Sequence, residues 1–421
     1  MKKLFFGALI VLQLLCGCSN KTSNIDYTNI PINYDYTNIS INYGSFHIGD
    51  IVYSLTPSGL IRYHANWEQG MNYFCTDPLC DHSGKDGVCP DCYELSGKSY
   101  ATDGERIYMN ARSYLPDHAG NIKRDNYQIY SFLPDGSDMK LLTSFDGSSG
   151  TQPNMRYHDG YLYFMQGFYK ENSTSRDDSY VHFMRVNTAT GKTEQALTEK
   201  YTTHDRFYVD EQYYYIIHMT GDIMTQTMDI LDHNGTIIEE AVMPDGHAVA
   251  YLTTYDDVTY AVCYDAREII TYGTANTCLT YSMYRLEGSK FIRLVDQIGG
   301  DGTQLVYVDG AFWYSPANEV YHGTKDMPTG NGKETAPVDF ISYTDGSLVR
   351  YDLKTGESQT WKVDDAESEI IFLGISDDTA IIEIANTAKE FRDGTSDKEI
   401  YKATLNHDGT ITINGKIEVG Q

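Results

Sequence analysis

The sequence predicts an all-β protein built as a single β-propeller, and three observations lead to this prediction. A hairpin pattern recurs along the chain, in which an apolar run, an acidic turn and an aromatic run follow one another. Tyrosine and phenylalanine are abundant, with 36 and 15 residues, and aromatic side chains suit a pleated, half-buried surface. Each hairpin is followed by two further short apolar runs. Four short strands in a unit of about fifty residues are typical of a propeller blade.

The clearest hairpin is the segment 157–164, with the sequence YHDGYLYF. Asp-Gly between two alternating runs favours a tight type I′ turn, because both central residues of that turn need a positive φ. The pattern returns at 101–109 (ATDGERIYM) and 308–314 (VDGAFWY), and in looser form at 209–215 (VDEQYYY), 255–260 (YDDVTY) and 376–382 (SDDTAII).

These repeats predict seven four-stranded blades, although six or eight blades would also fit the spacing. The expected blade starts lie near Ser45, Ser99, Asn154, Asp205, Ala250, Thr303 and Glu369. The sixth unit carries a long insertion, residues 315–341, which is rich in Gly, Pro and Asn. Such insertions lie in loops on one face of a fold and often carry function.

Residues 1–17 have the features of a bacterial lipoprotein signal peptide. Two lysines precede an apolar run too short for a finished transmembrane helix, and the run ends in the lipobox-like sequence LCGCS at 15–19. We therefore predict that Cys18 is diacylated and becomes the mature N-terminus. Cys16 is the weaker candidate, because the leucines before it are bulkier than the residues before Cys18. A lipid anchor predicts an extracytoplasmic protein attached to the bacterial cell membrane.

Residues 18–44 would form a tether, and residues 45–421 the propeller domain. The tether contains a tandem duplication, DYTNIPINY at 26–34 and DYTNISINY at 35–43. Both copies alternate Ile with polar residues, which is strand periodicity. The duplication is interpreted either as a strand that closes the ring or as a spacer.

The chain is strongly acidic, with a formal net charge of −27, and removal of Lys2 and Lys3 with the leader would leave −29. That charge repels phosphate backbones, so the sequence predicts no nucleic-acid partner.

Two groups of cysteines stand out. The segment 75–92 holds Cys75, Cys80, His82, Cys89 and Cys92 in one Gly- and Pro-containing loop. Four cysteines allow two disulfides, which an exported protein permits, whereas Cys75, Cys80, His82 and Cys89 would form a Cys3His structural zinc site. Cys263 and Cys278 are expected on neighbouring strands of the fifth blade, where they form a candidate disulfide.

The repeated strand, Asp-rich turn and aromatic strand resemble the YWTD-type propellers of lipoprotein-receptor ectodomains. The chain is more similar to uncharacterised lipoproteins of anaerobic gut bacteria with a YWTD-like or TolB-like propeller domain of unknown function. Those proteins carry a Cys-x4-Cys-x-His…Cys element after the first blade, and Cys75, Cys80, His82 and Cys89 match it here. This resemblance favours zinc, while the additional Cys92 favours disulfides, so both alternatives stay open.

Motifs for catalysis are missing from the sequence. No Gly-x-Ser-x-Gly, His-Glu-x-x-His or P-loop occurs. We therefore predict a binding or scaffold lipoprotein for a protein or glycan partner. The alternative is a carbohydrate-active enzyme whose acids, from different blades, converge at the propeller funnel.

Lipidation can be tested by metabolic labelling with a palmitate analogue. We expect label in the wild type and in Cys16→Ala, and none in Cys18→Ala, because only Cys18 would carry the acyl chains. Labelling of both variants, or a mature N-terminus at another residue, would contradict the prediction.

Overall fold

The structure is a computed structural model, and every regular element that it describes is a β-strand. It describes residues 45–48, 51–56, 59–63, 71–73, 99–116, 122–145, 149–168, 180–202, 205–218, 226–244, 247–255, 257–265, 281–299, 306–308, 310–317, 319–328, 335–343, 345–364, 368–376, 379–386, 398–417 and 419–420. Within these ranges no helix has the length and apolar character needed to cross a membrane. The predicted leader and tether lie outside them.

The described strands form seven sheets of four or five strands, here numbered as blades 1 to 7, and one separate hairpin. Blade 1 contains β1 (Ser45–Ile48), β2 (Ile51–Thr56), β3 (Gly59–Tyr63), β4 (Met71–Tyr73) and β31 (Val419–Gly420). Blade 2 contains β5 (Ser99–Thr102), β6 (Ile107–Pro116), β7 (Ile122–Phe132) and β8 (Lys140–Phe145). Blade 3 contains β9 (Ser149–His158), β10 (Tyr161–Phe168), β11 (Tyr180–Asn187) and β12 (Thr193–Tyr201). Blade 4 contains β13 (Arg206–Val209), β14 (Tyr214–His218), β15 (Thr227–Leu231) and β16 (Ile237–Val242).

The remaining blades follow the same order along the chain. Blade 5 contains β17 (His247–Tyr255), β18 (Val258–Asp265), β19 (Tyr281–Glu287) and β20 (Lys290–Ile298). Blade 6 contains β21 (Val306–Val308), β22 (Ala311–Tyr314), β25 (Ser347–Asp352) and β26 (Ser358–Lys362). Blade 7 contains β27 (Glu369–Ser376), β28 (Thr379–Ala385), β29 (Lys398–Leu405) and β30 (Ile411–Lys416). The separate hairpin pairs β23 (Glu319–Pro328) with β24 (Thr335–Tyr343).

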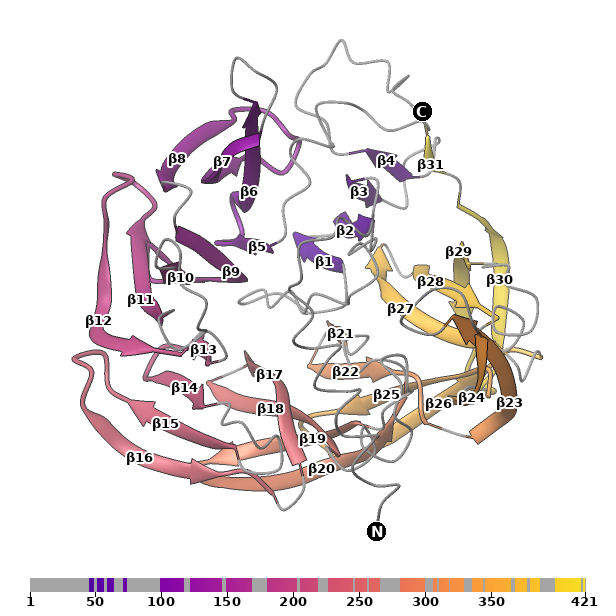
Figure 1. Cartoon of the computed structure of the whole chain (residues 1–421). Helices are drawn as coiled ribbons and strands as arrows, with labels where there is room; N and C mark the ends of the chain where they lie inside the picture. Colours follow the sequence, from indigo (N-terminus) through magenta and orange to yellow (C-terminus); the bar gives the residue numbers. More distant parts are fainter. Residues whose placement is uncertain are drawn as a thin grey trace.

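The blades are arranged around a common centre, with the first strand of each blade nearest the middle (Figure 1). The ring closes where β1 and β2 of blade 1 contact β27 of blade 7. The C-terminal strand β31 then pairs in parallel with β4, so that Val419 lies opposite Met71 at the outer edge of blade 1. The prediction of an all-β propeller is confirmed.

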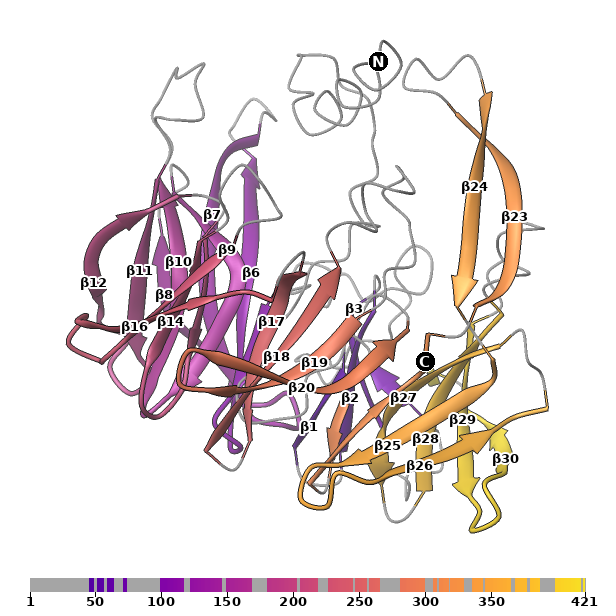
Figure 2. The same ribbon diagram turned by 90° about the horizontal axis from the view of Figure 1, so that it is seen from below.

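The insertion predicted in the sixth unit forms the β23–β24 hairpin, which projects away from the blades (Figure 2). Each expected blade start lies at, within or up to three residues before the first strand of a described sheet. Local sequence patterns therefore marked the repeat boundaries well.

Two kinds of turn join the first and second strands. At Asp159-Gly160 both central residues have positive φ, 44° and 76°, so the predicted type I′ geometry is present. At Asp103-Gly104 the expected two-residue turn was wrong. Thr102 pairs with Ile107, which leaves a four-residue turn. The Asp103 side chain stabilises this four-residue turn.

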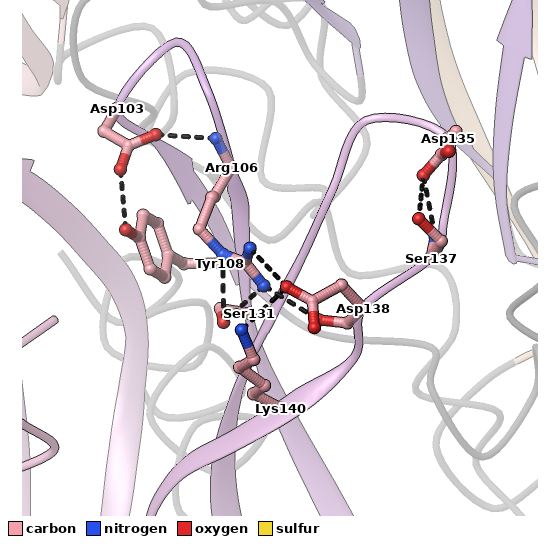
Figure 3. Close-up of polar contacts among 8 residues, drawn as sticks. All are labelled: Asp103, Arg106, Tyr108, Ser131, Asp135, Ser137, Asp138 and Lys140. Carbon is pink, nitrogen blue, oxygen red and sulfur yellow. Dashed lines mark hydrogen bonds and ion pairs between the residues drawn. The ribbon is translucent and has the colours of Figure 1, made fainter. Parts of the chain in front are cut away.

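The carboxylate of Asp103 organises this wider turn (Figure 3). Its Oδ1 accepts hydrogen bonds from the backbone amides of Glu105 and Arg106, at 2.9 and 2.6 Å. Its Oδ2 accepts the hydroxyl proton of Tyr108 at 2.7 Å. Blade 4 repeats the arrangement with Asp210, whose Oδ2 accepts from Tyr215 at 2.7 Å. An Asp followed five residues later by a Tyr is thus a local turn-forming unit.

The hydrophobic core is divided into layers between neighbouring blades. Six clusters of the described residues each join two adjacent blades around the ring. In β14, Tyr214 and Ile216 pack toward blade 3, while Tyr215 and Ile217 pack toward blade 5. Because successive side chains of a strand point to opposite faces, a strand covered on both sides reads as a continuous apolar run.

The bond between Asp103 and Tyr108 can be tested by a double-mutant cycle with Asp103→Asn and Tyr108→Phe. We expect a coupling free energy of about 1 kcal/mol, as measured from urea unfolding, because one charged hydrogen bond is lost in each single variant. Strictly additive effects of the two substitutions would contradict this account of the turn.

Candidate functional site

A pocket of about 580 Å³ lies between blades 4 and 5, at the rim formed by their turns. This volume falls within the usual range of ligand-binding sites. Its lining from blade 4 is Asp210, Glu211, Gln212, Tyr213, Tyr215, Ile230, Ile238 and Glu239. Its lining from blade 5 is Thr254, Asp257, Val258, Thr259, Arg285, Leu286, Glu287 and Gly288.

Blade 5 carries a small side chain beside the pocket, at a position where blades 3 and 6 carry a tyrosine. Strand register makes Thr254, Tyr157 and Tyr307 equivalent, since each lies one residue before the last strand residue ahead of a two-residue turn. Between blades 2 and 3, Tyr157 stacks on Tyr108 with the ring centroids 5.9 Å apart. Between blades 5 and 6, Tyr307 stacks on Tyr255 at 3.6 Å. Thr254 leaves the corresponding space open.

A chain of hydroxyl groups forms the floor beside Asp210. The Thr259 hydroxyl donates to Asp210 Oδ2 at 2.8 Å, and the Tyr208 hydroxyl donates to Thr254 Oγ1 at 2.8 Å. The hydroxyls of Thr254 and Thr259 lie 3.1 Å apart. Burial and then the nearby charge of Asp210 raise the pKa of Tyr215 far above its ordinary value, so Tyr215 stays a neutral donor.

Five carboxylates and one guanidinium line the pocket, which gives it a formal charge of −4. Glu211 and Asp257 are exposed and come from the two facing turns. Glu239 accepts a hydrogen bond from the hydroxyl of Ser289 across the blade interface at 3.1 Å. The guanidinium of Arg285 pairs with Glu287 of the same blade.

Apolar side chains share the lining with these charges. Ile238, Val258 and Leu286 contribute aliphatic surface, and Tyr213 contributes a half-buried ring. Nowhere in the described part of the chain do three or more His, Cys, Asp or Glu side chains gather in a way that could hold a metal ion. The lining of the pocket thus combines apolar and charged surface.

The sequence had drawn attention to other residues. Cys18 and the cysteine loop with Cys75, Cys80, His82, Cys89 and Cys92 lie outside the described residues, so lipidation and the choice between zinc and disulfides stay predictions. Cys263 is buried in β18 with a free thiol, and the register places Ser282 opposite it. Cys278 lies outside the described residues.

The sequence analysis placed Asp257 and Asp210 in hairpin turns and singled out neither of them, nor Glu239 or Glu287, as a site residue. The available signal was the threonine at position 254, where blades 3 and 6 have tyrosine. It becomes informative only once strand register aligns the repeats.

Apart from the pocket, a buried charged side chain lies on the first strand of blade 3. Arg156 of β9 is fully buried, with its guanidinium 3.9 Å from the ring centroid of Tyr208 in β13. Its Nη2 donates to the backbone carbonyl of Leu252 in β17 at 2.9 Å. Burial lowers the pKa of Arg156 to about 9. Arg156 thus connects the first strands of three consecutive blades.

A third polar cluster lies at the other end of blade 4, away from the Asp210 turn. His218 Nε2 lies 3.0 Å from Asp229 Oδ2, and His218 Nδ1 lies 3.6 Å from Asp205 Oδ1. Asp205 raises the pKa of His218 the most, and the value reaches about 9. Although Asp205 is farther away than Asp229, its side chain is only 5% exposed, so water screens its charge less. A histidine that keeps its proton at neutral pH is an ion-pair partner and not a general base.

Comparisons with known proteins concern the fold. No protein-family model matches the chain, and no curated protein matches it. Among solved structures, it is similar to a puromycin hydrolase, with 13% identity over 94% of this chain and 56% of that chain and a TM-score of 0.44. An acylaminoacyl peptidase from Pyrococcus horikoshii shares 9% identity over 88% of this chain and 52% of that chain, with a TM-score of 0.44.

The β-propeller domain of the trilobed protease from Pyrococcus furiosus is also similar, with 12% identity over 75% of this chain and 95% of that domain and a TM-score of 0.33. The chain spans about half the length of the puromycin hydrolase and of the acylaminoacyl peptidase. Identities and TM-scores this low transfer neither an activity nor a blade number to this protein.

The His218 ion pairs predict a pH dependence of stability. Because the folded pKa of about 9 exceeds the ordinary value of 6.5, the stabilisation is complete below pH 6.5 and is lost as the pH rises through 9. His218→Gln should lower the unfolding free energy by about 1 to 2 kcal/mol at pH 6 and by much less at pH 10. Urea unfolding at both values measures this, and an equal loss at both would contradict the assignment.

Proposed function

We propose that this protein is a lipid-anchored, extracytoplasmic binding module that holds a partner molecule in the pocket between blades 4 and 5. The observation that carries the proposal is the pocket itself. One interface of a repetitive ring is left open by Thr254, while tyrosine stacks occupy the matching positions at two other interfaces. A preformed pocket on a rigid frame binds without a large cost of ordering.

Sequence features support the cellular setting of this proposal. The basic, then apolar leader and the lipobox around Cys18 favour attachment to the outer side of the bacterial cell membrane. The proposed kinship with lipoproteins of gut anaerobes agrees with that location. The acidic surface keeps the domain away from anionic lipid headgroups, so the tether would hold it clear of the membrane.

The proposal is tested with Thr254→Tyr, which restores the side chain of the matching position in blade 3. We expect the variant to fold. Tyr215 is hydrogen-bonded to Asp210 as Tyr108 is to Asp103, so a tyrosine at position 254 can stack on Tyr215 as Tyr157 stacks on Tyr108. Binding should be lost because the ring fills the pocket. The measurement compares wild type and variant in pull-downs from the native envelope and on glycan arrays, with thermal unfolding as the folding control.

Each outcome of this comparison is informative. A protein or glycan that binds the wild type and not the folded variant supports the binding module and identifies the partner. Equal capture by both proteins would overturn the role of the pocket. Cleavage of an array glycan by the wild type would instead favour the carbohydrate-active enzyme.

A further inference from the structure

We infer that the pocket between blades 4 and 5 recognises the cationic side chains of a lysine- or arginine-bearing polypeptide. This inference rests on the proposed function and names its ligand class. Three properties of the pocket lead to it: its charge, its apolar walls and the positions of its exposed carboxylates.

The charge excludes anionic ligands and favours cations. Five carboxylates face one guanidinium, and that guanidinium already pairs with Glu287. Asp210 is saturated by the turn and by the hydroxyls of Tyr215 and Thr259. Glu211 and Asp257 are exposed on the two turns that flank the pocket, where a bound cation can reach them. An inorganic cation is a poor match, since no group of ligating side chains suited to a metal occurs among the described residues.

The apolar walls of the pocket match the aliphatic stem of a lysine or arginine side chain. Lysine and arginine bury their aliphatic stems along apolar surface and keep the charged end among polar groups. Ile238, Val258 and Leu286 provide the apolar surface. The ring of Tyr213 adds a face on which a cation can be attracted by the π-electrons. A neutral glycan would leave the carboxylates without a counter-charge.

The sharpest probe is a fluorescein-labelled pentalysine peptide, compared with its fully Nε-acetylated form. Acetylation keeps the aliphatic stem of each lysine and removes its positive charge.

Because the whole protein is acidic, the test compares two variants that remove the same number of carboxylates, one in the pocket and one elsewhere on the same rim. Glu211→Gln with Asp257→Asn removes two pocket carboxylates, and asparagine tolerates the positive φ of 60° at position 257.

The matched control is Glu105→Gln with Asp159→Asn. These residues are exposed on the corresponding turns of blades 2 and 3, where the Tyr108–Tyr157 stack closes the interface. Asp159 also has a positive φ, 44°, so the backbone demand is the same. Both double variants change the net charge by the same amount.

We expect fluorescence anisotropy to show binding of pentalysine and not of the acetylated peptide. The pocket double variant should weaken the Kd about tenfold, and the control double variant about twofold or less. Equal weakening by the two double variants would mean non-specific attraction to an acidic surface and would overturn the inference. Tight binding of the acetylated peptide would overturn it as well.

Failure of this inference is distinguishable from failure of the proposed function. If pentalysine binding is non-specific while Thr254→Tyr still abolishes capture of a native partner, the pocket binds another ligand class. If Thr254→Tyr changes neither pentalysine binding nor native capture, both the inference and the proposed function are wrong.

Discussion

The fold depends on one constraint: each four-stranded sheet must be covered on both faces by its neighbours. Tyr214 and Tyr215 are adjacent in one strand, yet they belong to different hydrophobic layers. A single blade would leave both faces of such a strand in water, so no blade is stable by itself. Closure of the ring removes the two open faces at its ends. Here the contact of blade 1 with blade 7, together with the pairing of β31 on β4, achieves that closure.

Acidic residues on this rim have two different roles. Asp103 and Asp210 sit in turns with both oxygens occupied by local donors, and their role is to shape the backbone that presents each strand to its neighbour. Glu211 and Asp257 lie on the same rim but are exposed beside a cavity. The large negative charge of the chain therefore combines turn-forming carboxylates with carboxylates that are open to a ligand.

A repetitive architecture also offers a simple route to a binding site. In a ring of similar blades, one small side chain at an interface can leave space for a ligand while large side chains fill other interfaces. Thr254 does this between blades 4 and 5, and its hydroxyl joins a polar floor that a tyrosine ring would have covered. Blades 3 to 5 also contain the buried Arg156, whose contacts with Tyr208 and Leu252 hold their first strands together. The two blades that line the pocket are thus joined through Arg156 on their first strands.

The sequence by itself determined the strands, the positions of the acidic turns and the repeat, because these depend on the local alternation of apolar and polar residues. It did not predict the four-residue form of the Asp103 turn. The abundance of aromatic residues indicated half-buried strand surfaces, and Tyr108 and Tyr157 stack on such surfaces between two blades. Only the tertiary structure decided which faces meet. The strand register places Ser282 opposite Cys263, and Thr259 of blade 5 donates to Asp210 of blade 4. The pocket lies where Thr254 stands in place of a tyrosine side chain. Its lining comes from two blades, so only the packing of blade 5 against blade 4 reveals it.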